Sequence, residues 1–243
     1  MSAINLAQIR ALTFDCYGTL IDWETGLSGI LNAWAQSVGV AHRDDALLEL
    51  YGRHEAAIEA ESPSLLYLDV VREAMRRIAS ELDSTATPEW IERLGRSVGE
   101  WPAFPDSAES LLRLKNRYRL CILSNVDHAS FAGSARKLIV DFDLVVTAQD
   151  VGHYKPSLDN FHVLLHRLKA AGVEPHQILH VAQSLFHDHA PAQQLGLKTV
   201  WIDRRLGKAG QGSTPAPAVE VHYDAVFPSM RAFAAWAAAW ALA

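Results

Sequence analysis

Cysteine is scarce in this chain, which carries Cys16 and Cys121 among its 243 residues. Two cysteines exclude a disulfide-rich scaffold. Both stand in apolar, strand-like runs, so we predict two reduced, buried thiols in a cytoplasmic protein. Cys16 directly follows a candidate nucleophile, yet no histidine adjoins it to hint at a thiolate pair, and this favours packing over catalysis.

Long apolar segments and basic clusters are missing too. The apolar stretch 233–243 is shorter than the roughly 20 residues that a membrane-spanning helix needs, and residues 1–10 lack the pattern of a signal peptide. Lys and Arg number 22 against 28 Asp and Glu, which gives a net charge of −6, and they form no cluster. We therefore predict neither a membrane nor a nucleic acid as a partner.

What the chain does contain is a series of short apolar runs, each followed by a turn. Near-continuous apolar strands that alternate with helical patterns are typical of a parallel sheet covered on both faces. The predicted fold class is therefore α/β, with a doubly wound, Rossmann-like parallel sheet. The predicted strands are 12–14, 120–123, 144–146, 178–181 and 198–202.

The pattern changes between residues 21 and 101, where no comparable apolar run occurs. Helical spacing there predicts helices at 23–38, 44–61, 65–82 and 88–101. We interpret 21–101 as an all-helical cap domain inserted after the first strand, and 1–20 with 102–243 as the α/β core. Such a cap would lie over the strand tips and close a site there. The glycine-, serine- and proline-rich segment 207–217 is predicted to be a surface loop.

Polar residues stand at or just after the ends of predicted strands: Asp15, Ser124 with Asn125, Lys155 and Asp188. Each alone has an ordinary structural explanation, such as a helix cap, a turn or a solvated side chain. A parallel sheet gathers the carboxyl ends of its strands along one edge, so residues far apart in sequence converge there. Together these positions predict an active site at that edge.

Four stretches resemble the motifs of the haloacid dehalogenase-like hydrolase superfamily: FDCYGTL at 14–20, LSN at 123–125, HYKP at 153–156 and SLFHD at 184–188. The resemblance implies that Asp15 is a nucleophile that forms an aspartyl ester. It implies that Lys155 favours the ionised carboxylate, that Thr19 and Ser124 orient it, and that Asp188 assists the hydrolytic water or positions Lys155.

Position 17 separates two chemistries within this superfamily. In its phosphatases, the residue two places after the nucleophile is an acid that protonates the leaving oxygen, and the fourth motif supplies carboxylates for Mg²⁺. This chain has Tyr17 at the first position and Gln183 in the fourth motif. Because Mg²⁺ prefers anionic oxygen ligands, both departures disfavour a phosphatase. We predict no metal and no cofactor.

The stretch around Asp15 is most similar to the L-2-haloacid dehalogenase (type II) branch, in which the aspartate displaces halide from a saturated carbon without a metal. The resemblance implies that Asn125 cradles the halide or the carboxylate. That branch also carries a cap arginine that binds the halide, and the arginine in the matching region here is Arg53. Arg53 is either that ligand or a solvated helix residue. Phe161 replaces a tyrosine of the branch, and Gln183-Ser184-Leu185 replaces Ser-Ser-Asn.

The predicted function is metal-independent dehalogenation of small 2-haloalkanoic acids through an ester on Asp15, with a small-molecule carboxylate as the partner. Two enzymatic alternatives stay open. One is attack by the same nucleophile on another carbon–heteroatom bond, such as ring opening of azetidine-2-carboxylate, which would need a proton donor. The other is a Mg²⁺-dependent phosphatase. The predicted substrate-binding residues are Tyr17, Asn125, Arg53, Ser184 and His187.

The sequence disfavours two further possibilities, a non-catalytic binding protein and a zinc site. A non-catalytic binding protein is disfavoured because the catalytic polar set is complete. A zinc site at His187 and His189 is disfavoured because these residues flank Asp188 on different sides of a helix start, whereas zinc needs three or four converging ligands. A homodimer through the cap or the terminal helix is an arrangement that the sequence allows.

Overall fold

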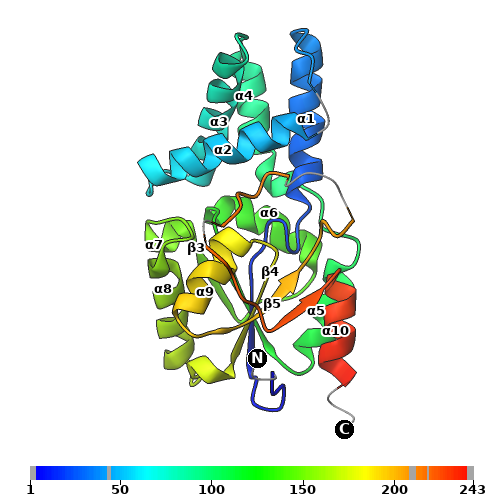
Figure 1. Ribbon diagram of the computed structural model, residues 1–243, viewed down its shortest axis with the longest axis vertical. Coiled ribbons are helices and arrows are strands. Elements are labelled where there is room, and N and C mark those ends of the chain that lie inside the picture. The colour runs from blue at the N-terminus through cyan, green and yellow to red at the C-terminus, as the bar shows by residue number, and fades with distance from the viewer. Residues whose placement is uncertain (1–3, 43–44, 208–211, 218, 240–243) are drawn as a thin grey trace.

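The computed structural model describes residues 4–42, 45–207, 212–217 and 219–239. Its centre is a six-stranded sheet in the order β3-β2-β1-β4-β5-β6, and each neighbouring pair is parallel (Figure 1). β1 lies between β2 and β4, so the carboxyl ends of these three strands meet at one edge. The predicted α/β fold is confirmed.

The strands follow the apolar runs of the sequence, except for β6, which was not predicted. β6 is a short edge strand whose Val226 is 47% exposed, so it lacks the buried apolar run that marks the others. The strands are β1 (Ala11–Phe14), β2 (Arg119–Ser124), β3 (Leu144–Thr147), β4 (Ile178–Ala182), β5 (Lys198–Ile202) and β6 (Ala225–Phe227).

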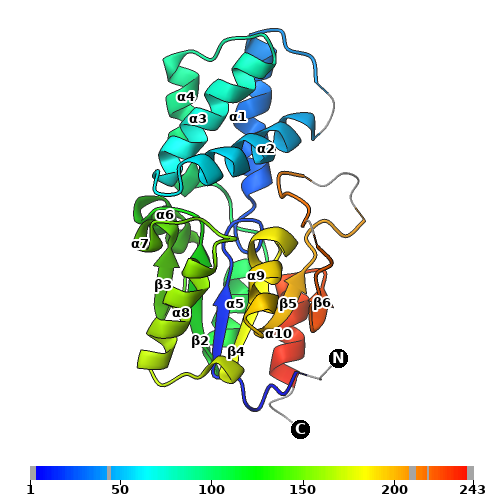
Figure 2. The same cartoon turned by 60° about the vertical axis from the view of Figure 1, so that its left-hand side comes forward.

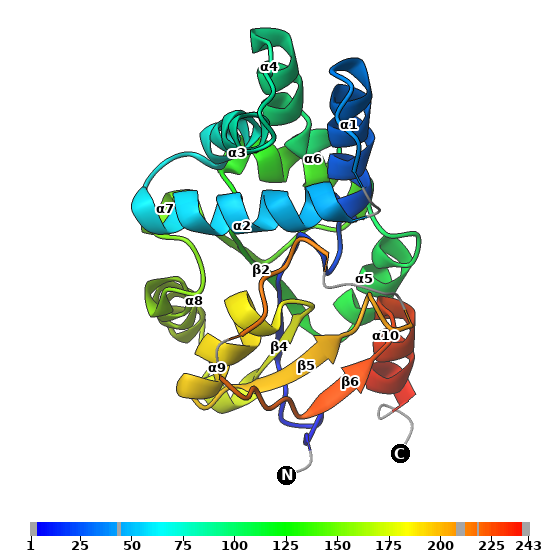
Figure 3. The same cartoon turned by 45° about the horizontal axis from the view of Figure 1, so that its top comes forward.

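Helices cover both faces of the sheet (Figures 1 and 3). Leu120 and Ile122 of β2 join the apolar cluster on one face, and Cys121 and Leu123 join the cluster on the other, as the alternation of a strand requires. The first face carries α5 (Ser107–Lys115), α6 (His128–Leu138) and α10 (Met230–Ala239), and the second carries α8 (Leu158–Ala170) and α9 (Ala190–Gln194). Shorter elements are α7 (Ala148–Val151), η2 (Pro175–Gln177) and η3 (Leu185–His189).

Most of the segment between β1 and β2 forms a group of helices beyond the carboxyl edge of the sheet (Figure 2). They are α1 (Trp23–Ser37), α2 (Ala46–Glu61), α3 (Tyr67–Glu81), α4 (Pro88–Arg96) and η1 (Val98–Glu100). The last predicted helix is thus divided into α4 and a 3₁₀ turn. On this arrangement we propose that residues 21–101 act as a cap on the core, with α2 crossing nearest the sheet edge (Figure 3).

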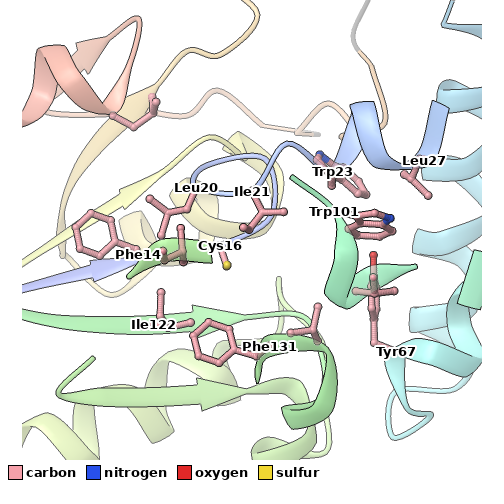
Figure 4. Packing of buried hydrophobic residues seen from close by; sticks show 14 of the residues in the cluster. Phe14, Cys16, Leu20, Ile21, Trp23, Leu27, Tyr67, Trp101, Ile122 and Phe131 are labelled. Atoms are coloured by element: carbon pink, nitrogen blue, oxygen red, sulfur yellow. The ribbon is translucent and has the colours of Figure 1, made fainter. Parts of the chain in front are cut away.

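The two connections between this group and the sheet run side by side. Ile21 pairs with Ala103, and the backbone N–H of Asp22 donates to the carbonyl of Pro102 over 2.8 Å. Trp23 and Trp101 pack here together with Leu27 (Figure 4). A Cβ atom on Gly26 would come within 2.1 Å of the Trp101 ring, so α1 rests directly on that ring. The entry and exit of the cap therefore form one packed junction.

Two predictions from composition can be compared with this structure. Cys16 and Cys121 are both buried and free, as predicted. In the described ranges, no helix is both long and apolar enough to cross a membrane. Of the predicted surface loop 207–217, residues 208–211 lie outside the described residues, and residues 212–217 form no helix or strand.

Candidate active site

The carboxyl edge of the sheet holds a small cavity of about 40 Å³ beneath the cap. β1, β2 and the turn after β4 supply its floor, and α1, α2 and α3 supply its roof. The residues that line it are Asp15, Tyr17, Trp23, Glu55, Glu59, Tyr67, Ser124, Asn125, Val126, Lys155, Ser184, His187, Asp188 and Thr214.

Asp15 lies directly after β1, and its carboxylate is held on both oxygens. Lys155 Nζ donates to Oδ1 over 2.9 Å, and Thr19 Oγ1 donates to Oδ2 over 2.6 Å. Thr19 is itself fixed, because its hydroxyl accepts the backbone N–H of Gln183 over 2.9 Å. Asp15 is 5% exposed and lines the cavity. A carboxylate so fixed faces the cavity in one orientation.

Lys155 joins Asp15 to Asp188. Its ammonium donates to Asp15 Oδ1 at 2.9 Å, to Asp188 Oδ1 at 2.8 Å and to the carbonyl of Leu123 at 3.0 Å. An ammonium group has three protons, so these contacts use its whole donor capacity. The two carboxylates hold the pKa of Lys155 above its ordinary value although burial alone would lower it. Lys155 therefore stays charged.

The two aspartates respond differently to the same burial. Desolvation raises the pKa of Asp15, and the Lys155 ammonium and Thr19 hydroxyl only partly oppose that rise. Desolvation would also raise the pKa of Asp188, but Lys155 and a hydrogen bond from His180 bring it well below its ordinary value. Asp188 therefore stays ionised near neutral pH and anchors Lys155.

His180 is a site residue that sequence reasoning missed. Its Nε2 lies 3.0 Å from Asp188 Oδ1 and its Nδ1 lies 2.8 Å from Thr13 Oγ1, all fully buried. An ionised carboxylate only accepts hydrogen bonds, so the Nε2–H of His180 donates to Asp188. The available signal was a histidine inside an apolar strand, at the register of Thr13 on β1.

Ser124 ends β2 and Asn125 follows it, and the two side chains have different partners. Asn125 exchanges hydrogen bonds with the backbone of Lys155, accepting its N–H at 2.6 Å and donating to its carbonyl at 3.0 Å, so it sets the position of that residue. Ser124 is 1% exposed, and its hydroxyl has no partner among the described residues. Its free hydroxyl is therefore available to a molecule bound in the cavity.

Tyr17 and His187 also line the cavity. The Tyr17 hydroxyl is bonded to Ser134 Oγ on α6 at 2.8 Å, and its ring meets Trp101 edge-on. Ser184 begins η3, where its hydroxyl accepts the N–H of His187 at 2.9 Å. Burial lowers the pKa of His187 to about 4, so its imidazole is neutral near pH 7.

Arg53 is not brought into the cavity. Its side chain is 59% exposed and forms a bidentate pair with Glu81 of α3. The reason is helical geometry, because each residue turns about 100° around the axis. Glu55 points inward from α2, and Arg53, two residues earlier, therefore points outward.

A family model described as haloacid dehalogenase-like hydrolase matches residues 9–196. The chain belongs to the haloacid dehalogenase-like hydrolases. The resemblance seen in the motifs is confirmed.

Individual relatives of this hydrolase are distant in sequence. It is 27% identical to (S)-2-haloacid dehalogenase 4A of Burkholderia cepacia over 203 residues, which are 81% of this chain and 84% of that protein. It is 28% identical to haloacid dehalogenase-like hydrolase domain-containing protein 3 of Xenopus laevis over 170 residues, 68% of each chain. A similar solved structure is that of L-2-haloacid dehalogenase from Xanthobacter autotrophicus with chloropropionic acid covalently bound, with a TM-score of 0.75. The match covers 93% of this chain and 97% of that one at 19% sequence identity, so the two proteins share the fold.

The cap of this haloacid dehalogenase-like hydrolase contributes two buried carboxyl groups that the sequence did not reveal. Glu55 and Glu59 are 4% and 6% exposed. Tyr67 and Tyr51 donate to Glu55 Oε1 at 2.5 and 3.3 Å, and Asn125 donates to Glu59 Oε2 at 3.3 Å. Burial raises the pKa of Glu55 to about 7 and that of Glu59 well above its ordinary value. Glutamates on a helix with many polar residues usually face solvent. The four-residue spacing of Glu55 and Glu59 therefore does not by itself indicate that they are buried in a site.

This burial predicts a pH-dependent gain from Glu55→Gln. The unfolded chain ionises Glu55 near pH 4.5, whereas the folded protein keeps the proton to about pH 7, so Glu55 weakens folding progressively as the pH rises through that window. We expect the variant to raise the free energy of unfolding by about 3 kcal/mol near pH 8 and by little near pH 4. Urea denaturation at both pH values measures it, and Glu81→Gln is the exposed control. An equal gain at both pH values would contradict the burial of a titrating carboxyl.

Proposed function

We propose that this hydrolase displaces a leaving group from a saturated carbon through an ester on Asp15, with small 2-haloalkanoic acids as its substrates. One observation carries the proposal. The Asp15 carboxylate is fixed at the cavity by Lys155 and Thr19, and the residue two places on is Tyr17 rather than an acid. The relationship to (S)-2-haloacid dehalogenase 4A supports the same reaction.

The first step needs no proton donor. A carboxylate oxygen of Asp15 attacks the carbon that bears the halogen, the carbon–oxygen bond forms, and the carbon–halogen bond breaks with its electron pair going to the halide. Halide leaves as a stable anion. The Tyr17 hydroxyl, bonded to Ser134, therefore has no acid role to fill in this step.

The second step is hydrolysis of the ester. Water attacks the side-chain carbonyl carbon of Asp15, the ester bond breaks, and the hydroxy acid leaves with the substrate-side oxygen, which takes up one of the water protons. The second water proton is released to solvent as the Asp15 carboxylate re-forms. Lys155 and Thr19 already donate to both oxygens of that carboxyl group, so they are placed to stabilise the negative charge that develops there. Asp188 Oδ2 has no partner among the described residues and is available to orient the water.

The hydrogen bonds on the carboxylate oxygens of Asp15 and Asp188 are less consistent with a Mg²⁺-dependent phosphatase. Oδ1 of Asp15 and Oδ1 of Asp188 both accept from Lys155, and Oδ2 of Asp15 accepts from Thr19. Asp188 Oδ2 is the remaining free oxygen of these two carboxylates among the described residues, so a cation would have to displace Lys155 or Thr19 to gain a second carboxylate ligand. Tyr17 and Gln183 supply no replacement charge, so these residues do not fit the ion.

A second candidate keeps the nucleophile and changes the leaving group to an amine, as in ring opening of azetidine-2-carboxylate. The observation that favours it is Glu55, a carboxyl group in the roof of the cavity that holds its proton to about pH 7. A departing amine takes up a proton, and such a group can supply it.

The test is turnover of a panel of 2-haloalkanoic acids, azetidine-2-carboxylate and a phosphate ester, with and without EDTA. We expect halide release from at least one haloacid, unchanged by EDTA. Turnover of the phosphate ester alone, abolished by EDTA, would overturn the proposal. Ring opening without halide release would favour the second candidate.

A further inference from the structure

The roof of the cavity presents two carboxyl groups from one face of α2. Glu55 and Glu59 are four residues apart, so they lie on the same face of the helix, about one turn from each other. The hydrogen bonds described for Glu55 all reach Oε1, and the one described for Glu59 reaches Oε2. Among the described residues, Glu55 Oε2 and Glu59 Oε1 accept no hydrogen bond and remain available to a ligand.

The cavity has more acids than its basic group can balance. Its lining includes four acidic residues, Asp15, Asp188, Glu55 and Glu59. Among the described lining residues, Lys155 is the one lysine or arginine. Lys155 spends its three donors on Asp15, Asp188 and the Leu123 carbonyl. A buried carboxylate without a cationic partner is costly, which is why burial raises the pKa of both Glu55 and Glu59. The lining therefore lacks a positive charge on the side of α2.

A separate observation shows that the cavity is built for a polar ligand. Ser124 Oγ and Asp188 Oδ2 are buried, line the cavity and have no hydrogen-bond partner in the described part of the chain. Buried polar atoms are normally satisfied, and each exception calls for an explanation. A polar ligand would satisfy Ser124 Oγ, and Asp188 Oδ2 is left for the water of the second step.

We propose that Glu55 and Glu59 form a subsite for a protonated amine, so that the substrate is a small acid that also carries an ammonium group. The inference rests on the proposed function for the reaction itself and adds the charge of the substrate. The ammonium lies against the free carboxyl oxygens of α2, while the electrophilic carbon faces Asp15 on the opposite side of the cavity.

Binding of unreactive probes tests the subsite without turnover. We expect the unmodified protein to bind propylammonium more tightly than 1-propanol, and 3-aminopropionate more tightly than propionate, in calorimetric titrations. Because the probes differ in charge and the protein does not, this comparison needs no variant. Equal affinity within each pair, or tighter binding of propionate, would overturn the proposal.

Variants then locate the effect. Glu55→Gln with Glu59→Gln keeps the shape and hydrogen bonding of α2 and should weaken propylammonium binding at least about 30-fold, the lower range for truncating a buried charged pair. Glu81→Gln, an exposed glutamate of α3, should leave it unchanged. Urea denaturation checks that each variant is folded, and ammonium binding that survives the double variant would place the cation elsewhere.

The proposed subsite and the proposed reaction can be disproved independently of each other. Asp15→Asn removes the nucleophile but not α2, so it should keep the preference for propylammonium over 1-propanol. If that preference is present and no haloacid is turned over, the reaction is wrong and the subsite stands. If 2-chloropropionate is hydrolysed as readily as 3-amino-2-chloropropionate, the reaction stands and the subsite is wrong.

Discussion

Asp15→Asn is expected to lower turnover of any accepted substrate by at least about 10⁴-fold, the scale seen when a covalent nucleophile is removed. The side chain keeps its size, and Thr19 can still donate to the amide oxygen in place of Oδ2. An amide is neutral and does not displace a leaving group from saturated carbon, so binding survives while chemistry stops. Steady-state halide or amine release measures the loss.

The control for this variant is Asp159→Asn, an aspartate whose side chain is 56% exposed at the start of α8. It should leave turnover unchanged. A single turnover with excess protein in ¹⁸O-labelled water identifies the intermediate. We expect the label to enter Asp15, because water attacks its carbonyl carbon, and the product to carry unlabelled oxygen. Label in the first product molecule would mean that water attacks the substrate directly.

Lys155→Met is expected to reduce both stability and activity. It removes the cation between Asp15 and Asp188, which are otherwise buried like charges. Breaking a buried ion pair by deleting one partner typically costs about 3–5 kcal/mol of unfolding free energy. Turnover falls as well, because the carboxylate of Asp15 loses the donor that orients Oδ1.

The stability loss should depend on pH in a defined direction. Lys155 keeps the pKa of Asp188 below its ordinary value, so its contribution is present above about pH 4 and fades as the pH falls further. Urea denaturation near pH 7.5 and pH 3 compares the two regimes. Lys115→Met is the matched control, because Lys115 pairs with Asp143 at a partly exposed site and should cost about 1 kcal/mol or less. A loss of the same size at both pH values would mean that Lys155 acts through packing alone.

The sheet and its family were predictable because they follow from local signals. Apolar runs mark the strands, and a parallel sheet brings their carboxyl ends together whatever the length of the intervening chain. Asp15, Ser124, Lys155 and Asp188 accordingly line one cavity. Their catalytic roles remain predictions, which the variants above address.

The cap residues were not predictable in the same way. Which face of α2 turns inward depends on how the helix packs, and a shift of two residues exchanges Arg53 for Glu55. His180 was missed because the sequence pattern around a single polar residue in an apolar strand does not indicate its partners. Its role became evident only from its contacts with Thr13 and Asp188. In both cases the deciding contact joins segments that no local pattern connects.

The reacting groups and the acidic roof occupy different stretches of chain. Asp15, Lys155 and Asp188 belong to the sheet edge, whereas Tyr51, Glu55 and Glu59 repeat every fourth residue along a single helix. On the proposed subsite, substitutions at Tyr51 or Glu55 would alter which molecules bind and leave the Asp15–Lys155 contact in place, whereas Glu59 also reaches the sheet edge through Asn125. Natural selection could therefore have retargeted this enzyme through a few codons of α2, and a library restricted to those three positions would explore the same route in the laboratory.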